Sequence, residues 1–288
     1  EVEGVRPDAR VVNMSLLGMD WYISQVKKKV YKADPVPSIL INEDFKGNSN
    51  NGVPIYNNKE LKTAKQAIKM IQKKDQCGSC GKKKRKKNDG VLCNCGGKFR
   101  GKCPKNIVIN IDKSKIPVED LENWKDENIV PQIILTIKGG GINQHEIALL
   151  DILANFNFER PLYFISAEQT LGRFTRIGKN PQSQQQLERY IGIMNYVQDE
   201  GAVSRLVPFK TNYNPFISPF EQENIDIDKS YDHLMHNYNY GNIPSGIDYQ
   251  KNSKIYYDYY TDRSIVGFRY PFLKTANALL ASGDNNRS

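Results

Sequence analysis

The sequence predicts an α/β fold in which a mostly parallel sheet is flanked by helices. Residues 10–17 form a largely apolar run that passes through Gly18 into a helix beginning at Asp20, and a buried strand followed at once by a helix is the unit of α/β layers. Residues 160–166 form a second buried strand, which follows a helix over 146–154 that is apolar nearly all round. A succession of strand, helix and strand favours parallel pairing with a right-handed crossover.

The first half of the chain supplies further elements of this fold. We expect a short strand at 39–41 and a helix over 60–74. The helix has one apolar face, because apolar residues recur in it at helical spacing. These residues are Leu61, Ala64, Ile68 and Ile71. Half-buried strands are expected at 106–111 and 132–137.

The second half of the chain is predicted to be less regular. Pro181 opens a helix that Gly201 ends as a C-cap, and residues 202–208 supply a last strand. Residues 215–260 are rich in Asn, Asp and Tyr and show weak periodicity. A final helix is expected over about 262–281.

This pattern divides the chain into three regions. We expect an α/β sandwich domain over 1–210, interrupted by a Cys/Lys-rich insert at 75–105, then a Tyr/Asn-rich irregular segment over 211–260 and a C-terminal helix over 261–288. Glu1 is not an initiator, so the chain is expected to be part of a larger protein. It contains no run of about 18 apolar residues and no charged-then-apolar leader, so this part is not expected to span a membrane or to carry an export signal.

The net charge of +9 comes from one segment of the chain. Residues 73–105 contain twelve Lys or Arg against Asp75 and Asp89, so this segment carries +10 and the other 255 residues sum to about −1. A domain that tracks phosphates usually spreads its cations over a folded face. The cationic run at 82–87 is therefore interpreted as a solvated loop, and nucleic acid is not expected as a partner.

All the cysteines of the chain lie in this insert. They are Cys77, Cys80, Cys93, Cys95 and Cys103. The first pair, with the glycine that follows it, resembles a zinc knuckle, in which tight turns direct thiolates to one tetrahedral ion. The second pair is Cys-x-Cys rather than Cys-x-x-Cys, and Cys103 could replace either member. Disulfides or unpaired thiols are slightly preferred to zinc, and disulfides, with one cysteine of the five left over, are favoured if the domain lies outside the cytoplasm. Either arrangement would staple a segment too polar to build its own core, and no other cofactor is required.

Asp20, Trp21 and Tyr22 are the candidate ligand-binding residues. They stand just past the expected end of the first strand, where open α/β sheets place their ligands. Trp and Tyr offer flat faces to a sugar ring and the Asp carboxylate can bond hydroxyls, whereas the alternative is that the aromatic rings belong to the core. His233 and His236 are interpreted as surface or packing residues, and no catalytic residue is assigned.

Several stretches of the chain resemble one family of membrane proteins. They are VRPDARVVNMSLLGMDWYI at 5–23, LLDILA at 149–154 leading to ERPLYF at 159–164, and EGAVSRLVP at 200–208. The family comprises large multi-span proteins of the Bacteroidetes, long filed as a domain of unknown function and related to animal protein O-mannosyltransferases with a glycosyltransferase-C fold. The stretches are scattered over most of the chain and follow the family's order.

This resemblance implies that the parent protein has a membrane-spanning N-terminal region and that the present chain lies on the extracytoplasmic, periplasmic side. Glycosyltransferase-C enzymes use a lipid-phosphate sugar donor and place their acidic catalytic residue on a loop near the membrane. The catalytic carboxylate is therefore expected upstream of Glu1, and the chain is expected to be inactive alone. The final helix resembles the first helix of a tetratricopeptide-like region. The Cys/Lys-rich insert replaces a shorter, cysteine-free stretch of the family.

The sequence thus predicts a soluble accessory domain of a membrane-bound glycosyltransferase-like protein. Its expected partners are the protein's own membrane-spanning region and a polypeptide or glycan acceptor. One alternative is a non-catalytic cell-envelope interaction module whose parent no longer transfers sugar. Another is a zinc-stapled nucleic-acid-binding protein, against which the charge distribution counts. The sequence has no dinucleotide-binding or phosphate-loop motif and no nucleophile elbow.

Overall fold

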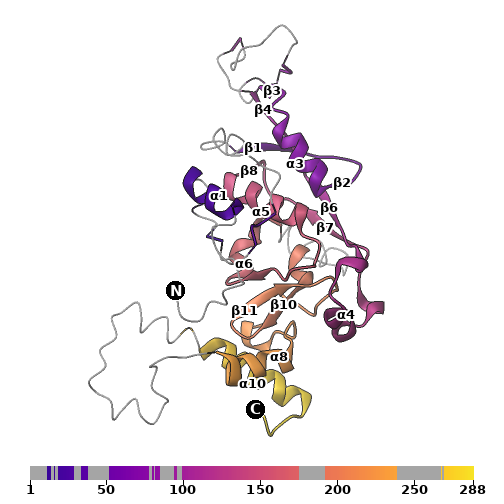
Figure 1. Cartoon of the computed structure of the whole chain (residues 1–288), viewed down its shortest axis with the longest axis vertical. Coiled ribbons are helices and arrows are strands. Elements are labelled where there is room, and N and C mark those ends of the chain that lie inside the picture. Colours follow the sequence, from indigo (N-terminus) through magenta and orange to yellow (C-terminus); the bar gives the residue numbers. More distant parts are fainter. Residues whose placement is uncertain are drawn as a thin grey trace, which may run out of the picture. The chain divides into compact units, whose positions relative to one another are not determined.

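The computed structural model forms two compact units (Figure 1). It describes residues 12–13, 16, 19–28, 34–37, 52–77, 80, 82–84, 94–95, 99–174, 192–238, 267 and 269–288. The N-terminal unit consists of Val5–Arg160 and Thr170–Ile193, and the C-terminal unit consists of Glu1–Gly4, Pro161–Gln169 and Met194–Ser288. The predicted domain limits at residues 210 and 260 stay a prediction.

The first sheet of the N-terminal unit is built around one short strand. Strand β1 (Val53–Tyr56) pairs parallel with β5 (Cys103–Pro104) and antiparallel with β8 (Gly141–Ile142). Separately, β3 (Gln76–Cys77) pairs antiparallel with β4 (Phe99–Arg100). The cysteines Cys77 and Cys103 thus belong to two different sheets.

The second sheet of this unit supplies much of its core. Strand β6 (Asn106–Asn110) lies between β2 (Lys62–Thr63), which is parallel to it, and β7 (Gln132–Thr136), which is antiparallel. The fully or nearly fully buried side chains of β6 and β7 are Ile107, Val108, Ile109, Ile133 and Leu135. The alternating pattern of exposure along β7 confirms the half-buried strand predicted at 132–137.

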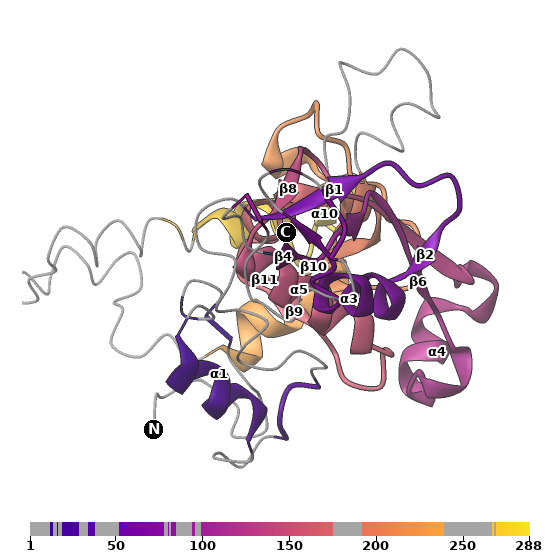
Figure 2. The same cartoon turned by 90° about the horizontal axis from the view of Figure 1, so that it is seen from above.

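Helices α3 (Ala64–Gln72) and α5 (Gln144–Asn155) pack against each other (Figure 2). Helix α3 begins with a capping box, in which Thr63 Oγ1 accepts from the Gln66 amide and Gln66 Oε1 accepts from the Thr63 amide. Its buried residues are Ala64, Ala67, Ile68 and Ile71. The predicted apolar face is therefore confirmed, except that Leu61 precedes the helix and is exposed.

Further helices and helical turns complete the described secondary structure outside the sheets and the α3–α5 pair. They are α1 (Asp20–Lys27), η2 (Lys113–Lys115), α4 (Val118–Trp124), η3 (Asp126–Asn128), α6 (Ala167–Thr170), η4 (Gly172–Phe174), η5 (Gly192–Tyr196), η6 (Pro219–Glu221), α8 (Ile227–Asp232), the π-helical turn η7 (His233–Asn237) and α10 (Arg269–Ser282). In the C-terminal unit, α10 packs against α8 and η6.

The C-terminal unit contains a three-stranded sheet in the order β10 (Val197–Glu200), β11 (Val203–Leu206) and β9 (Tyr163–Phe164). Both pairings are antiparallel. Strands β10 and β11 are joined at Gly201, whose φ of +69° lies in the left-handed region that a tight hairpin turn requires.

The sheets are mixed, which corrects the predicted mostly parallel fold. Among the described strands, parallel pairing is limited to β1 with β5 and β2 with β6. The predicted strand–helix–strand unit does not form a parallel pair, because the strands before and after α5, which are β8 and β9, belong to different sheets. Only the β10–β11 pair follows from a two-residue turn, which reverses the chain and leaves no room for a crossover. The run at 160–166 forms only the short strand β9, which pairs antiparallel with β11.

The helix predicted from Pro181 to Gly201 is wrong in its last part. Residues 197–200 form strand β10, and Gly201 closes a hairpin rather than a helix. Val197 is fully buried, so its burial comes from the sheet and not from a helical face. Residues 181–191 lie outside the described part of the chain, as do residues 39–41 and most of residues 10–17.

Helix α10 confirms the predicted C-terminal helix. Pro271 lies near the N-terminal end of the helix, and the chain stays helical on both sides of it. Among the helices that the structure describes, none combines the length and the apolar character needed to cross a bilayer.

Candidate functional site

A tight chain reversal in the N-terminal unit brings the first cysteine pair together. The amide of Cys77 donates to the Lys82 carbonyl at 2.9 Å, and the amide of Lys84 donates to the Asp75 carbonyl at 2.7 Å. Residues 82–84 therefore run back beside residues 75–77, and Cys80 lies in the turn between them. Strand β4 pairs with β3 on the same segment and follows Cys95 in the chain.

Three cysteine side chains converge on this turn. The Sγ atoms of Cys77, Cys80 and Cys95 all lie within 4.8 Å of one another, and those of Cys77 and Cys95 are 3.5 Å apart. Zinc–sulfur bonds of about 2.3 Å at tetrahedral angles place ligand sulfurs about 3.8 Å apart. Cys77 is buried, whereas Cys80 and Cys95 are exposed. The three thiols could therefore hold a metal ion with small side-chain adjustments.

The remaining cysteines are placed differently. Cys103 is fully buried in strand β5, outside the three-thiol group, and burial raises the pKa of its thiol to about 12. Its Sγ donates to the Pro104 carbonyl at 3.6 Å, so the group is a protonated thiol at neutral pH. Cys93 lies outside the described residues. The four described cysteines, Cys77, Cys80, Cys95 and Cys103, form no disulfide.

The predicted ligand-binding residues open helix α1. Asp20 is its first residue, and Trp21 is 56% exposed. The Trp21 and Tyr22 rings meet edge to face, with centroids 5.6 Å apart and an interplanar angle of 80°. The Tyr22 hydroxyl accepts a hydrogen bond from the Asn13 amide at 2.6 Å. Trp21 is thus not a core residue, and its role in binding stays a prediction.

The two histidines of the C-terminal unit contact aromatic rings. His233 stacks on Tyr238 with centroids 5.8 Å apart, and His236 meets the edge of Tyr231 at 5.9 Å. The described residues that could hold a metal together are the three cysteines, and neither histidine is among them. These contacts support the packing role that the sequence favours.

The sequence did not reveal a network of buried charge in the C-terminal unit. Glu200 is 1% exposed, and its carboxylate accepts from the Tyr163 hydroxyl at 2.9 Å. Lys229 Nζ lies 3.3 Å and Arg205 Nη1 3.6 Å from the Glu200 Oε1 atom. Burial raises the pKa of the nearby Asp226 carboxyl above its usual value, against the opposing effects of its helix-capping hydrogen bond and of Lys229.

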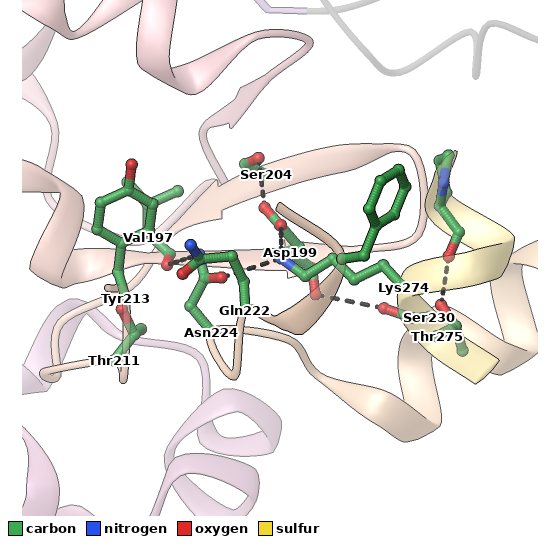
Figure 3. Close-up of polar contacts among 12 residues, drawn as sticks. Val197, Asp199, Ser204, Thr211, Tyr213, Gln222, Asn224, Ser230, Lys274 and Thr275 are labelled. Carbon is green, nitrogen blue, oxygen red and sulfur yellow. Dashed lines mark hydrogen bonds and ion pairs between the residues drawn. The ribbon is translucent and has the colours of Figure 1, made fainter. Parts of the chain in front are cut away.

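A second part of this network attaches the C-terminal helix (Figure 3). Lys274 Nζ on α10 forms an ion pair with Asp199 on β10 and donates to Asn224 Oδ1 at 2.9 Å. Asp199 also accepts from the Ser204 hydroxyl at 2.6 Å, and Asn224 Nδ2 donates to the Val197 carbonyl at 3.1 Å. The charged groups satisfy one another, so the arrangement stabilises the unit rather than presenting a reactive group.

The geometry defines a mixed α/β domain with a three-thiol cluster in a polar insert and a charge-paired C-terminal unit. A protein-family model described as TMEM260-associated domain 2 matches residues 1–229, most of the chain. The chain therefore belongs to the TMEM260-associated domain 2 family, a membrane-associated family, and is a domain of a TMEM260-like membrane protein. No curated protein and no solved structure matches it.

Proposed function

We propose that the chain is an accessory domain of a membrane-bound, glycosyltransferase-like protein and lies on the extracytoplasmic side of the membrane. It binds a polypeptide or glycan acceptor and contacts the membrane-spanning region of the same protein, while sugar transfer takes place elsewhere. Membership of a TMEM260-associated family supports the link to a membrane protein. The exposed Trp21 ring is the observation that carries the binding role.

The position of Trp21 suits a sugar or an extended peptide. A half-exposed indole at the start of a helix offers one apolar face, and the edge-to-face contact with Tyr22 limits the rotation of the ring. The hydrogen bond that the Asn13 amide donates to the Tyr22 hydroxyl fixes the position of the Tyr22 side chain. A ring held in this way loses little conformational entropy when a ligand stacks on it.

Tryptophan fluorescence tests this role directly, because the chain has only two tryptophans and the other, Trp124, is buried. We expect mannose oligosaccharides or a Ser/Thr-rich peptide to protect Trp21 from acrylamide quenching. Trp21→Ala removes this reporter, so binding to the variants is measured by calorimetry, and Trp21→Ala should abolish it. Phe216→Ala is the matched control, since Phe216 is an aromatic residue of similar exposure in the other unit. Unchanged quenching with both probes, or equal loss of binding in the control, would exclude the proposed site.

The three-thiol cluster supports a structural role for one zinc ion. Cys77, Cys80 and Cys95 would supply three soft ligands, and the fourth would be Cys93 or a water molecule. A bound ion would hold together an insert whose charge prevents it from building a core of its own. The competing arrangement is a disulfide within the same group.

Metal analysis with thiol counting distinguishes zinc from disulfide. We expect one zinc per chain, with thiols that react only after chelation or unfolding. Cys80→Ser should lose the ion, whereas Cys103→Ala should keep it, because Cys103 lies outside the thiol group. Cys93→Ser shows whether Cys93 is the fourth ligand. A metal-free protein with one free thiol of its five cysteines would replace the zinc proposal with two disulfides.

A further inference from the structure

Strand β7 forms one edge of the sheet in which β6 is the central strand. The Ile137 amide donates to the Lys105 carbonyl, and the Ile111 amide donates to the Pro131 carbonyl. In an antiparallel ladder, hydrogen-bonded residue pairs alternate with pairs that are not bonded, so these two bonds fix which residues of β7 direct their backbone toward β6. The residues between them direct their amides and carbonyls away from β6. They are Gln132, Ile134 and Thr136.

The outward backbone groups of this edge have no partner within the part of the chain that the structure describes. No hydrogen bond joins the amides or carbonyls of Gln132, Ile134 and Thr136 to another described residue. Gln132 is exposed and Ile134 is 45% exposed, so the edge is accessible. An unpaired edge of this kind is a row of donors and acceptors that fits another extended strand.

Strand β7 lacks the features by which proteins usually prevent pairing at an edge. Such features are charged side chains, prolines and bulges within the edge strand. Residues 132–136 contain neither a charge nor a proline, and they pair with β6 in unbroken register. Pro131 precedes the strand and Lys138 follows it. The strand itself is therefore open to pairing, because its uncharged, isoleucine-rich sequence favours an extended partner.

We infer that β7 pairs antiparallel with β7 of a second copy of this chain, with Ile134 facing its own counterpart. In this register the outward-pointing residues meet one another, since Gln132 lies opposite Thr136 of the other copy. An exposed apolar side chain then contacts an apolar one and a polar side chain contacts a polar one. Lys138 lies opposite Val130, so no like charges face each other.

The self-complementary pattern of β7 selects a second copy as the occupant. A two-fold interface uses the same surface on both subunits, so the strand must present a pattern that matches itself when it is reversed. The order polar, apolar, polar at Gln132, Ile134 and Thr136 has this property. The inference goes beyond the proposed function and depends on neither the zinc ion nor Trp21.

Sedimentation equilibrium of the full 288-residue chain tests the inference. Two five-residue strands form an interface at or below the low end of the size range of specific complexes, about 1,200 Å². We therefore expect a weak dimer, with a dissociation constant on the order of 10 µM. Loading concentrations from about 1 to 200 µM cover the transition from monomer to dimer.

Charge exchange at Ile134 tests the register. Ile134→Lys places like charges directly opposite each other and removes the apolar contact, so the dissociation constant should rise on the order of tenfold. Ile134→Glu should behave in the same way. An equal mixture of the two variants should dimerise again, because a lysine then faces a glutamate. Ile165→Lys is the matched control, since Ile165 is an 84% exposed isoleucine in the other unit.

Three results would overturn the inference. They are a wild-type chain that stays monomeric at all loading concentrations, equal weakening of the dimer by Ile134→Lys and Ile165→Lys, and a mixture of the two Ile134 variants that stays monomeric. Circular dichroism of each variant shows whether it is folded, and recovery of the dimer in the mixture requires folded chains. Acceptor binding is tested at Trp21, so the proposed function succeeds or fails separately.

Discussion

The cysteine-rich insert and the C-terminal unit both hold polar segments in a defined structure, but through different interactions. In the insert, three thiols converge on a turn whose short strands β3 and β4 span only two residues each. In the C-terminal unit, buried and partly buried carboxylates and cations from β10, β11, α8 and α10 neutralise one another. Thiols need only local chain reversals, whereas charge pairs require a sheet and helices to shield them from water.

This difference predicts how each region fails. Loss of one thiol of the cluster should unfold the insert locally, because the insert buries little apolar surface. Loss of one charge should destabilise the C-terminal unit as a whole, because the remaining partner is left buried without compensation. The variants below test that contrast, beginning with the largest expected effect.

Removal of the Glu200 carboxylate should have the largest effect on stability. Glu200→Ala leaves Arg205 buried, with Lys229 and the Tyr163 hydroxyl deprived of the acceptor they share. We expect the free energy of unfolding in urea to fall by about 3 kcal/mol. Glu221→Ala, at an exposed position of the same unit, should change it by less than about 0.5 kcal/mol. An equal fall in the free energy of unfolding of the two variants would show that the buried network does not contribute to stability.

Removal of the Lys274 ammonium group should have an intermediate effect. Lys274→Met keeps the apolar stem but leaves Asp199 and Asn224 Oδ1 without their cation. We expect a loss of about 1–2 kcal/mol, smaller than for Glu200 because both charged groups of this pair are partly exposed. Hydrogen exchange should accelerate in α10 before the rest of the unit. The control is Arg269→Met, which removes an exposed cation of the same helix, and matching exchange in both variants would contradict the anchoring role.

Loss of the Cys80 thiol should have a local effect. Cys80→Ser, or chelation of the proposed zinc ion, should accelerate tryptic cleavage within residues 73–105 by about tenfold or more. The free energy of unfolding of the N-terminal unit should change by less than about 0.5 kcal/mol, because its core lies in β6, β7, α3 and α5. Chelation followed by zinc addition serves as the control. Cleavage that is unaffected by chelation would mean that the thiols do not hold the insert through a metal.

Local features were predictable from the sequence, and long-range ones were not. The apolar face of α3 and the Cys77–Cys80 turn depend on spacings of three or four residues, which a single sequence displays directly. The contact between Asp199 and Lys274 joins residues 75 positions apart, and nothing in the sequence pairs them. The stretch 200–208 resembles a family in sequence. The role of Glu200 as a buried carboxylate shared by several partners follows only from the pairing of strands in the sheet.

The error at residues 197–200 has a physical origin. Val197 fits the helical spacing of Met194 and earlier apolar residues, so periodicity alone favoured a helix that Gly201 would end. In the structure, Val197 pairs with Leu206 across the hairpin and both side chains are buried. Glycine with positive φ serves a helix C-cap and a two-residue hairpin turn equally well, so only the pairing partner distinguishes them.

The smallest expected effect concerns the pH dependence of the C-terminal unit. The pKa of Asp226 is raised by burial and, to a lesser extent, by the Glu200 and Asp228 carboxylates, while its helix-capping bond and Lys229 lower it. A carboxyl whose folded pKa exceeds its unfolded value contributes stability at low pH that is lost as the pH rises through the folded pKa.

Asp226→Asn retains a capping oxygen for the Lys229 amide but does not ionise. The variant should therefore be at least as stable as the wild type at pH 7 and show a flatter pH profile above pH 4. Glu221→Gln, at an exposed position of the same unit, should leave the profile unchanged. An Asp226→Asn variant less stable than the wild type at neutral pH would mean that the Asp226 charge supports the network through Lys229.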